Sequence, residues 1–328
     1  MSGVVLYVLL PQLLDLWGQV PNLRSLGVVA LVLMALLQIG SWTSAAELDR
    51  VALPSLSRFA AVTTNYSANA VSGLLPGGGA VGAGLKYRMW AAAGTAAGEA
   101  ASALAAVSLI SLATLFALPI VTLGFAVLGA PVPQSLAAVA VGGAIVFVAF
   151  FALGSVYLTT DKPVRAVSRV VERIARKVKR PQLTEHAIID ARDRLRAALG
   201  SRWERALVFA VGVWACDYFS LAAALLALHT HPRLSVVLLA FLGSKILAML
   251  PLTPGGLGVV EAGLTGLLVL AGISASDALL ATLAYRVVSY WMSLPVGLGA
   301  YVLFRRRYHD VPRDPSEIAQ PMHPFAAE

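Results

Sequence analysis

The chain has 328 residues, of which 58% are hydrophobic and 13% are charged, and its mean hydropathy is +0.78. Soluble globular proteins carry about 25% charged residues, so this composition excludes a soluble enzyme and predicts a polytopic membrane protein. The net charge of +8 comes mainly from the segment between Asp161 and Arg202, which holds 12 Lys and Arg against 5 Asp and Glu. A surface that binds nucleic acid is therefore not expected.

The predicted helices follow the apolar stretches, because a helix that crosses a bilayer needs roughly 17–25 mostly apolar residues. The first stretch is short and contains Pro11 and Asp15. We expect an all-α protein with about six transmembrane helices and two helical hairpins broken by Pro and Gly. In chain order, the expected helical segments are 3–17, 26–47, 58–75, 96–126, 134–158, 206–228, 235–250, 259–272 and 278–304.

Breaks and charges divide the chain into two membrane halves, a basic loop and a tail. The tail begins with three arginines and becomes polar and Pro-rich, which predicts a disordered cytoplasmic segment. The expected parts are the N-terminal half 1–158 with a first broken hairpin at 58–96, the loop 159–204, the C-terminal half 205–304 with a second broken hairpin at 235–272, and the tail 305–328.

The two helix breaks resemble each other in sequence. Proline removes a backbone donor and glycine loosens the helix, so each helix must end at its break. Broken backbone at membrane depth persists only where protein or a watery cavity satisfies its polar groups, and paired breaks in two halves mark a transporter's central site. The alternative is that each break is an ordinary loop between helices. The first break has Pro76, Gly77 and Gly78 before Gly82 and Gly84; the second has Pro254, Gly255 and Gly256 before Gly258 and Gly263.

The distribution of positive charge predicts the orientation, because cytoplasmic loops are enriched in Lys and Arg. The loop 160–204 and the Arg305–Arg307 cluster are expected in the cytoplasm, together with both ends of the first broken hairpin. The segments that bound the second broken hairpin carry little positive charge and are expected on the opposite side. Two re-entrant hairpins that enter from opposite sides and are related by an inverted repeat satisfy these assignments. Four full spans in the second half also satisfy them.

The basic loop contains an amphipathic helical pattern. Val164, Val167, Val171, Ile174 and Val178 recur every three or four residues, and basic residues occupy most positions between them. This pattern is typical of a helix at the inner membrane surface that contacts anionic inner-leaflet lipids. The alternative is a linker that only sets the topology. Together with the Arg, Ala, Val and Gly bias of the chain, the loop indicates a multi-pass protein of a bacterial inner (plasma) membrane.

Ionisable residues within apolar spans identify the candidate site, because each one costs about 2.5 kcal/mol or more in a bilayer. Arginine offers a planar fork for phosphate and lysine a mobile charge, so Arg286 and Lys245 are candidates for binding a lipid headgroup. Glu261 is expected to pair with Arg286 or to meet an amine headgroup. Helix N-termini after Gly79 and Gly258 would add N–H donors. The ionisable candidates are Glu99, Asp217, Lys245, Glu261 and Arg286.

Each candidate also has a purely structural interpretation. The charged residues would then be buried ion pairs that set the helix register, or would lie at wet helix ends. Asn65 and Asn69 would join helices by hydrogen bonds, and Tyr285 and Tyr290 would pack or lie at the interface. His229 and His231 lack acidic or Cys partners nearby in the sequence, so no metal site and no cofactor is expected.

The motif Pro251-x-x-Pro254-Gly255-Gly256-Leu257-Gly258-x-x-Glu261, followed by Tyr285-Arg286 and Pro295, resembles the lysylphosphatidylglycerol synthase transmembrane (flippase) family. The earlier segment from Asn69 through Pro76-Gly77 to Lys86-x-Arg88 is similar to that family's first motif. The resemblance covers roughly residues 26–304. That family includes the flippase half of the multiple peptide resistance factor, so the resemblance implies a membrane domain that translocates lipids.

Carried over to this sequence, the resemblance implies substrate contacts at the second break and around it, and more loosely at the first. Bifunctional family members have an aminoacyl-transferase domain after the membrane part, so the expectation here is a transporter without enzymatic activity. The residues implied at the second break are Glu261, Arg286 and Pro254 to Gly258, and the first motif contributes Asn69, Pro76, Gly77, Lys86 and Arg88. The polar and charged residues within the spans and the first break itself add Lys245, Asp217, Asn65, Gly78 and Glu99 to the candidate substrate-binding residues.

The leading interpretation is a lipid flippase that moves a phospholipid, an aminoacylated phospholipid or an isoprenoid-linked lipid through a polar midplane groove. The chain contains no Walker motif, so the energy for such transport is expected from gradients, a partner or mass action. A second interpretation is a membrane scaffold subunit that partners a separate lipid-modifying glycosyltransferase or synthase. The expected protein partners are accordingly a second copy of the chain or such an enzyme. A third interpretation is an intramembrane enzyme, which is disfavoured because the chain contains no His-Glu-x-x-His or Gly-x-Ser-x-Gly motif.

Overall fold

The computed structural model describes residues 27–75, 78–127, 202–250 and 253–308, with a few further positions between 141 and 152. Several predicted features lie outside the described residues. They are the helix at 3–17, most of the span at 134–158, nearly all of the basic loop 160–204, the tail from 309 onward, and Pro76 and Gly77 of the first break.

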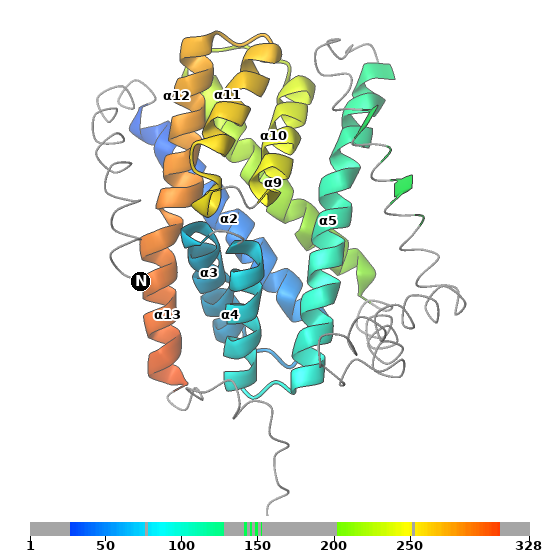
Figure 1. Ribbon diagram of the computed structural model, residues 1–328, viewed down its shortest axis with the longest axis vertical. Helices are drawn as coiled ribbons and strands as arrows, with labels where there is room; N and C mark the ends of the chain where they lie inside the picture. Colours follow the sequence, from blue (N-terminus) through cyan, green and yellow to red (C-terminus); the bar gives the residue numbers. More distant parts are fainter. Residues whose placement is uncertain are drawn as a thin grey trace, which may run out of the picture.

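All regular structure in the described part of the chain is helical, which confirms the all-α class (Figure 1). Most bounds lie within about five residues of those expected, but the helix Gly78–Ala92 is not among the expected helices and is covered only by the first broken hairpin at 58–96. The elements are α2 (Val28–Ala52), α3 (Arg58–Leu74), α4 (Gly78–Ala92), α5 (Ala97–Val127), α9 (Trp203–Ala227), α10 (Leu234–Met249), the 3-10 turn η2 (Pro254–Gly256), α11 (Val259–Leu270), α12 (Ala275–Arg286), the π-helical turn η3 (Val287–Trp291) and α13 (Ser293–Arg307).

Four helices in the described part are long and apolar enough to cross a membrane: Val28–Ala52, Ala97–Ile120, Trp203–Ala227 and the 33-residue Ala275–Arg307. The helices of the two broken hairpins are shorter: α3 has 17 residues and α4 has 15, and α10 and α11 have 16 and 12. A span needs roughly 20 residues. The helices of the broken hairpins are therefore shorter than a typical membrane span, whereas the four long helices are not.

Two long helices, α2 and α9, cross at the centre of the molecule (Figure 1). Small residues allow the close approach, since a Cβ on Gly40 would lie 3.4 Å from the Cys216 sulfur and one on Gly212 would lie 2.9 Å from Ser44 Oγ. Ser41 also donates a hydrogen bond of 2.9 Å to the carbonyl of Val213. Small side chains and interhelical hydrogen bonds hold helices together where water supplies no hydrophobic driving force.

The two broken hairpins meet end to end. In Figure 1, α3 and α4 lie in the lower half with α3 beside α13, and α10 and α11 lie in the upper half with α11 beside α12. The breaks adjoin at mid-height, where a Cβ built on Gly255 would overlap the carbonyl oxygen of Gly73. Gly255, Gly256 and Gly258 have φ angles of 59°, 70° and 80°, a region that favours glycine. The second break therefore depends on its glycines for its path and for its contact with the first.

The last apolar segment is not one regular helix, as the expected helix 278–304 would be. α12 ends at Arg286, the next turn is π-helical, and α13 then continues to Arg307. Single π-helical turns inside α-helices occur frequently at functional sites. Here the π turn directly follows the charged residue of the predicted site and carries Tyr290.

The apolar core is divided into two clusters. One cluster joins α9, α10, α11 and α12 around Leu225, Phe241 and Tyr285. The other joins the end of α2 to α3, α4, α5 and α13 around Trp90 and Phe304. Polar side chains from both halves of the chain lie between the two clusters, at the level where the breaks meet.

Candidate functional site

A polar cavity of about 270 Å³ lies at the centre of the bundle. Helices from both halves of the chain line it, together with the π turn. Its charged and amide side chains come from five helices, α2, α3, α9, α10 and α12, and four aromatic side chains complete much of the wall. The polar lining includes Gln38, Asn69, Asp217, Lys245 and Arg286, and the aromatic lining is Trp42, Trp214, Tyr285 and Tyr290.

Arg286 and Glu261 form an ion pair, as expected from the sequence. Arg286 Nε donates to Glu261 Oε1 over 2.6 Å, and an Nη2 hydrogen reaches the carbonyl of Gly255 over 3.0 Å. The guanidinium lies over the ring of Tyr290, 4.6 Å from its centroid, and Tyr290 donates to the carbonyl of Gly73 over 3.0 Å. One arginine thus links α11, the second break and, through Tyr290, the first broken hairpin.

Glu261 also caps helix α11. Its Oε2 accepts a hydrogen bond of 2.7 Å from the backbone N–H of Gly258, the residue that precedes the helix. A carboxylate in the first turn is favourable beside the positive end of the helix dipole. The helix N-terminus that the sequence suggested as an anion-binding donor is therefore occupied in part by the protein's own carboxylate.

A second charged group in the cavity contains Asp217, Lys245 and Tyr285. Lys245 Nζ lies 2.5 Å from Asp217 Oδ2 and donates to the Tyr285 hydroxyl over 2.7 Å, which donates to Asp217 Oδ1 over 2.6 Å. Lys245 also lies over the rings of Phe241 and Tyr285. The Lys245 ammonium is thus held by two protein side chains, the Asp217 carboxylate and the Tyr285 hydroxyl. Tyr285 therefore has a polar role beyond the packing or interfacial role expected for it.

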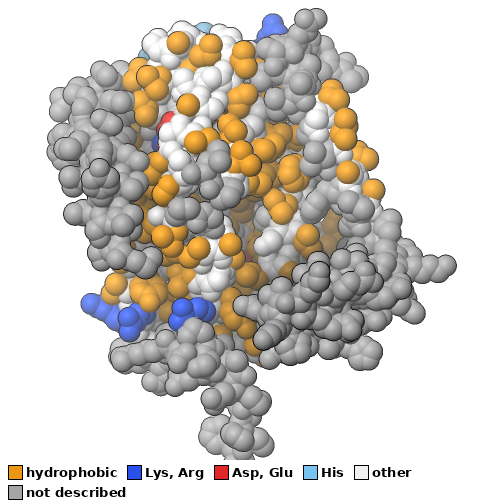
Figure 2. Space-filling model, viewed as in Figure 1, with side chains coloured by type: hydrophobic (Ala, Val, Ile, Leu, Met, Phe, Trp, Pro, Cys, Tyr) orange, Lys and Arg blue, Asp and Glu red, His pale blue; other side chains and the backbone are white. Residues whose placement is uncertain are grey.

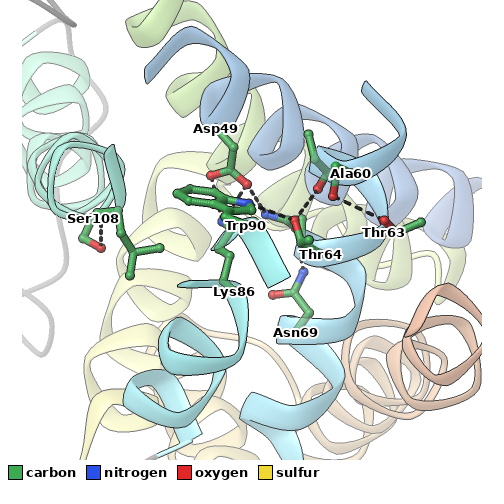
Figure 3. Close-up of polar contacts among 11 residues, drawn as sticks. Asp49, Ala60, Thr63, Thr64, Asn69, Lys86, Trp90 and Ser108 are labelled. Atoms are coloured by element: carbon green, nitrogen blue, oxygen red, sulfur yellow. Dashed lines mark hydrogen bonds and ion pairs between the residues drawn. The ribbon is translucent and has the colours of Figure 1, made fainter. Parts of the chain in front are cut away.

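A third charged group, the Asp49 cluster, lies between α2, α3 and α4, where Figure 3 shows Asp49 and Lys86 pointing toward each other beside Trp90. Lys86 Nζ lies 2.7 Å from each Asp49 oxygen. Asn65 donates to Asp49 Oδ2 over 3.3 Å, and Asn69 donates to Asn65 Oδ1 over 3.2 Å. Asn69 lines the central cavity, so a chain of two amides connects that cavity to the Asp49 cluster.

An apolar groove of about 720 Å³ runs between the first broken hairpin and α13. Val71, Leu74, Val81 and Leu298 are among its lining residues, and Arg88 is the charged residue within its described lining. A smaller cavity of about 420 Å³ separates the breaks themselves, lined by residues that include Gly78, Gly79, Gly255 and Gly256.

The predicted site residues therefore divide into several places. Glu99 is exposed in the first turn of α5 and does not line the central cavity. Pro76 and Gly77 lie outside the described residues. The central cavity brings together Asn69, Asp217, Lys245 and Arg286, and Arg286 is bonded to Glu261 and Gly255. At the breaks, Pro254 begins η2, Gly258 precedes α11, and Gly256 and Gly78 line the space between the two breaks. Asn65 and Lys86 belong to the Asp49 cluster, and Arg88 lines the apolar groove.

Sequence reasoning missed Asp49 and Gln38. Asp49 lies beyond residue 47, where the second helix was expected to end, yet α2 continues to Ala52 and Asp49 is fully buried. Gln38 is 3% exposed, and with its amide oriented to satisfy both neighbours it donates to Asp217 and accepts from Trp42 Nε1. A polar residue inside an apolar span was the available signal for Gln38. No group of three or more potential metal ligands occurs among the described residues.

Comparison with known proteins places the chain among membrane proteins. The family model described as "Lysylphosphatidylglycerol synthase TM region" matches residues 2–297. Two curated relatives described as "UPF0104 membrane protein", from Methanothermobacter thermautotrophicus, match as well. One is 28% identical over 182 residues, 52% of this chain and 52% of the relative; the other is 30% identical over 97 residues, 30% of this chain and 28% of the relative. The chain thus spans about half the length, or less, of these relatives, and no solved structure matches it.

Proposed function

This chain belongs to the lysylphosphatidylglycerol synthase transmembrane-region family, and from that premise we propose that it moves a phosphate-bearing lipid between the leaflets of a membrane. The observation that carries the proposal is the central cavity, in which Arg286, Lys245 and Asp217 lie together inside a largely apolar bundle. Charges at such depth cost about 2.5–3.5 kcal/mol each even by the lowest scales, and they mark substrate pathways.

The size of the cavity favours a headgroup over a whole lipid. Pockets that hold drug-sized ligands measure about 300–1,000 Å³, and this cavity measures about 270 Å³. We propose that the headgroup enters the cavity while the acyl tails stay in the bilayer. The apolar groove between the first broken hairpin and α13 offers one tail a path along the protein surface.

Arg286 is the proposed headgroup ligand. Its Nε and Nη2 hold Glu261 and Gly255, while Nη1 makes no hydrogen bond among the described residues. The planar fork can therefore donate to a phosphate without first releasing Glu261. Lys245 is bonded to both Asp217 and Tyr285, so its proposed role is to keep the cavity wall charged and in place.

The two broken hairpins are proposed to be re-entrant and related by an inverted repeat. The packing supports this arrangement, because α3 of the first hairpin packs on α13 and α10 of the second packs on α5. Each half thus provides a long helix that covers the hairpin of the other half. A two-fold axis in the membrane plane would relate the two halves in this reciprocal way, since it maps each hairpin and its covering helix onto the other hairpin and its covering helix.

The test is leaflet exchange in proteoliposomes that contain a phospholipid with a fluorescent headgroup. With Arg286→Gln we expect the protein-dependent rate to fall at least about tenfold, because the charge-assisted bond to phosphate is lost. Arg306→Gln, on the exposed end of α13, is the matched control and should exchange at the wild-type rate.

A second variant separates loss of binding from loss of folding. Glu261→Gln together with Arg286→Gln removes both charges, so no uncompensated carboxylate stays in the bundle. We expect this double variant to fold and still not to move lipid. Wild-type exchange rates in a folded Arg286→Gln protein would refute the proposed role of the arginine, and the absence of exchange by the wild-type protein would refute the function.

A further inference from the structure

A second basic pocket, distinct from the central cavity, lies where α2 ends and α9 begins. It measures about 640 Å³ and is lined by three arginines, Arg50, Arg202 and Arg205, and by two carboxylates, Glu47 and Glu204. Pro54, Val208 and Phe209 form part of an apolar wall. Among the residues that the structure describes, the pocket shares none of its lining with the central cavity or with the apolar groove.

The described residues do not balance the charges of this pocket. Glu47 is already shared, since Oε2 accepts from Arg50 Nη1 over 2.7 Å and Oε1 accepts from Arg58 Nε over 2.8 Å. Arg202 and Arg205 form no ion pair within the described residues. Both lie at the start of α9, where the helix dipole adds positive potential. The pocket therefore attracts an anion.

A buried donor in the same pocket lacks a partner. Arg50 Nε is inaccessible to solvent and makes no hydrogen bond in the described part of the chain. A buried N–H group left unpaired costs about 1–3 kcal/mol, and this one belongs to the arginine that lines the pocket. Nε is covered by protein atoms, so an oxygen of a bound anion reaches it only after the Arg50 side chain changes rotamer. The side chain is 33% exposed, which allows that change, and the unpaired donor favours it.

The surroundings of the pocket indicate a lipid and not a soluble anion. Figure 2 shows Lys and Arg side chains at the lower end of the described surface, where α13 ends with Arg305–Arg307, and hydrophobic side chains above them. Trp203 is 57% exposed beside the pocket, as is typical of aromatic residues at the headgroup level. Val208 and Val211, 66% and 47% exposed, continue up α9 as an apolar track.

We propose that this pocket binds the phosphate of an anionic glycerophospholipid in the leaflet at that end of the molecule, with an acyl chain lying along the exposed face of α9. The bound lipid is resident and is not the transported substrate. It joins the end of α2 to the start of α9, the two helices that cross at the centre, so it stabilises the scaffold on which the cavity is built.

The full-length protein in detergent is titrated with phosphatidylglycerol, and bound lipid is counted by native mass spectrometry. We expect Arg205→Gln and Arg50→Gln each to weaken phosphatidylglycerol binding by about tenfold, the usual scale for losing one charge-assisted contact. Arg306→Gln, at the same end but outside the pocket, should bind as the wild type does. Arg205 is exposed and makes no described ion pair, so its variant keeps the test valid if Arg50→Gln fails to fold.

Two comparison arms identify the ligand. Phosphatidylcholine should be retained at least about tenfold more weakly than phosphatidylglycerol, because its choline group meets the same arginines. Inorganic phosphate should not displace phosphatidylglycerol at equal concentration, because it has no chain to contact α9. Equal binding by Arg205→Gln and Arg306→Gln, equal retention of both lipids, or displacement by inorganic phosphate would each overturn the proposal. None of these outcomes depends on lipid translocation.

Discussion

Arg286 and Lys245 occupy the same cavity but are held in different ways. Both are basic residues on apolar helices, and from the sequence both are candidates for binding a lipid headgroup. Lys245 is bonded to Asp217 and to the Tyr285 hydroxyl, whereas Arg286 holds Glu261 and a backbone carbonyl and keeps donors to spare. Five N–H groups in a planar fork allow arginine to be anchored and still bind a ligand.

The Asp49 cluster provides the clearest stability prediction at the residue scale. Lys86→Met leaves Asp49, which is 0% exposed, without its cation, and we expect it to destabilise the protein by about 3–5 kcal/mol. Adding Asp49→Asn in the same chain should restore most of the lost stability, because the buried side chain is then an uncharged amide. Unfolding midpoints in a denaturing detergent series measure both effects.

A surface pair serves as the control for that prediction. Arg58 is bonded to Glu47 with its side chain 74% exposed, and Arg58→Gln should cost no more than about 1 kcal/mol, as exposed ion pairs do. If Lys86→Met and Arg58→Gln shifted the midpoint equally, the Asp49–Lys86 pair would not be the buried element that its geometry indicates.

At the scale of elements, the two breaks act as one joint. The sequence shows each break separately, as a Pro-Gly segment between short apolar helices. In the fold the second break packs against the end of α3, and Tyr290 of the π turn donates to the carbonyl of Gly73 at the same place. Backbone groups freed by the broken helices thus find partners in other elements, as burial in an apolar bundle requires.

Gly255→Ala tests this joint. Gly255 has a φ of 59°, and a Cβ there would overlap the Gly73 carbonyl oxygen and the Tyr290 ring. The left-handed backbone costs roughly 1–2 kcal/mol for alanine and overpacking about 1–3 kcal/mol more, so we expect a marked fall in the folded yield and in the unfolding midpoint.

Gly266→Ala in α11 is the matched control, because nothing lies within 4 Å of a Cβ at that position. Alanine favours a helix by about 1 kcal/mol over glycine, so this variant should be neutral or slightly stabilising. Equal effects of Gly255→Ala and Gly266→Ala would show that the two breaks do not press on each other as described.

At the scale of the whole molecule, the arrangement places one broken hairpin in each half of the bundle, with the charged cavity between two apolar clusters. Ser55 and Arg306 lie at one end, and Ser276 lies at the other. If the hairpins are re-entrant, the two ends face opposite sides of the membrane and Gly79 lies at the depth of the breaks.

Cysteine labelling tests this topology in a Cys216→Ser background, because Cys216 is the single native cysteine. An impermeant maleimide should label Ser55→Cys and Arg306→Cys from one side and Ser276→Cys from the other. Gly79→Cys, where a Cβ meets open space, should react slowly from both sides. Rapid labelling of Gly79→Cys from the Ser276 side would mean that α3 and α4 cross the membrane fully.

The sequence by itself determined the membrane class, the family, the helices and the two breaks, because apolar length and helix-breaking residues act locally along the chain. It also indicated that Glu261 would pair with Arg286. Only the tertiary structure decided that Asp217 and Lys245 both bond to the Tyr285 hydroxyl and that Lys86 pairs with Asp49. It also decided that Glu99 lies at the surface. Those partners lie on different helices, and an ion pair between helices depends on their crossing and rotation, which no local pattern encodes.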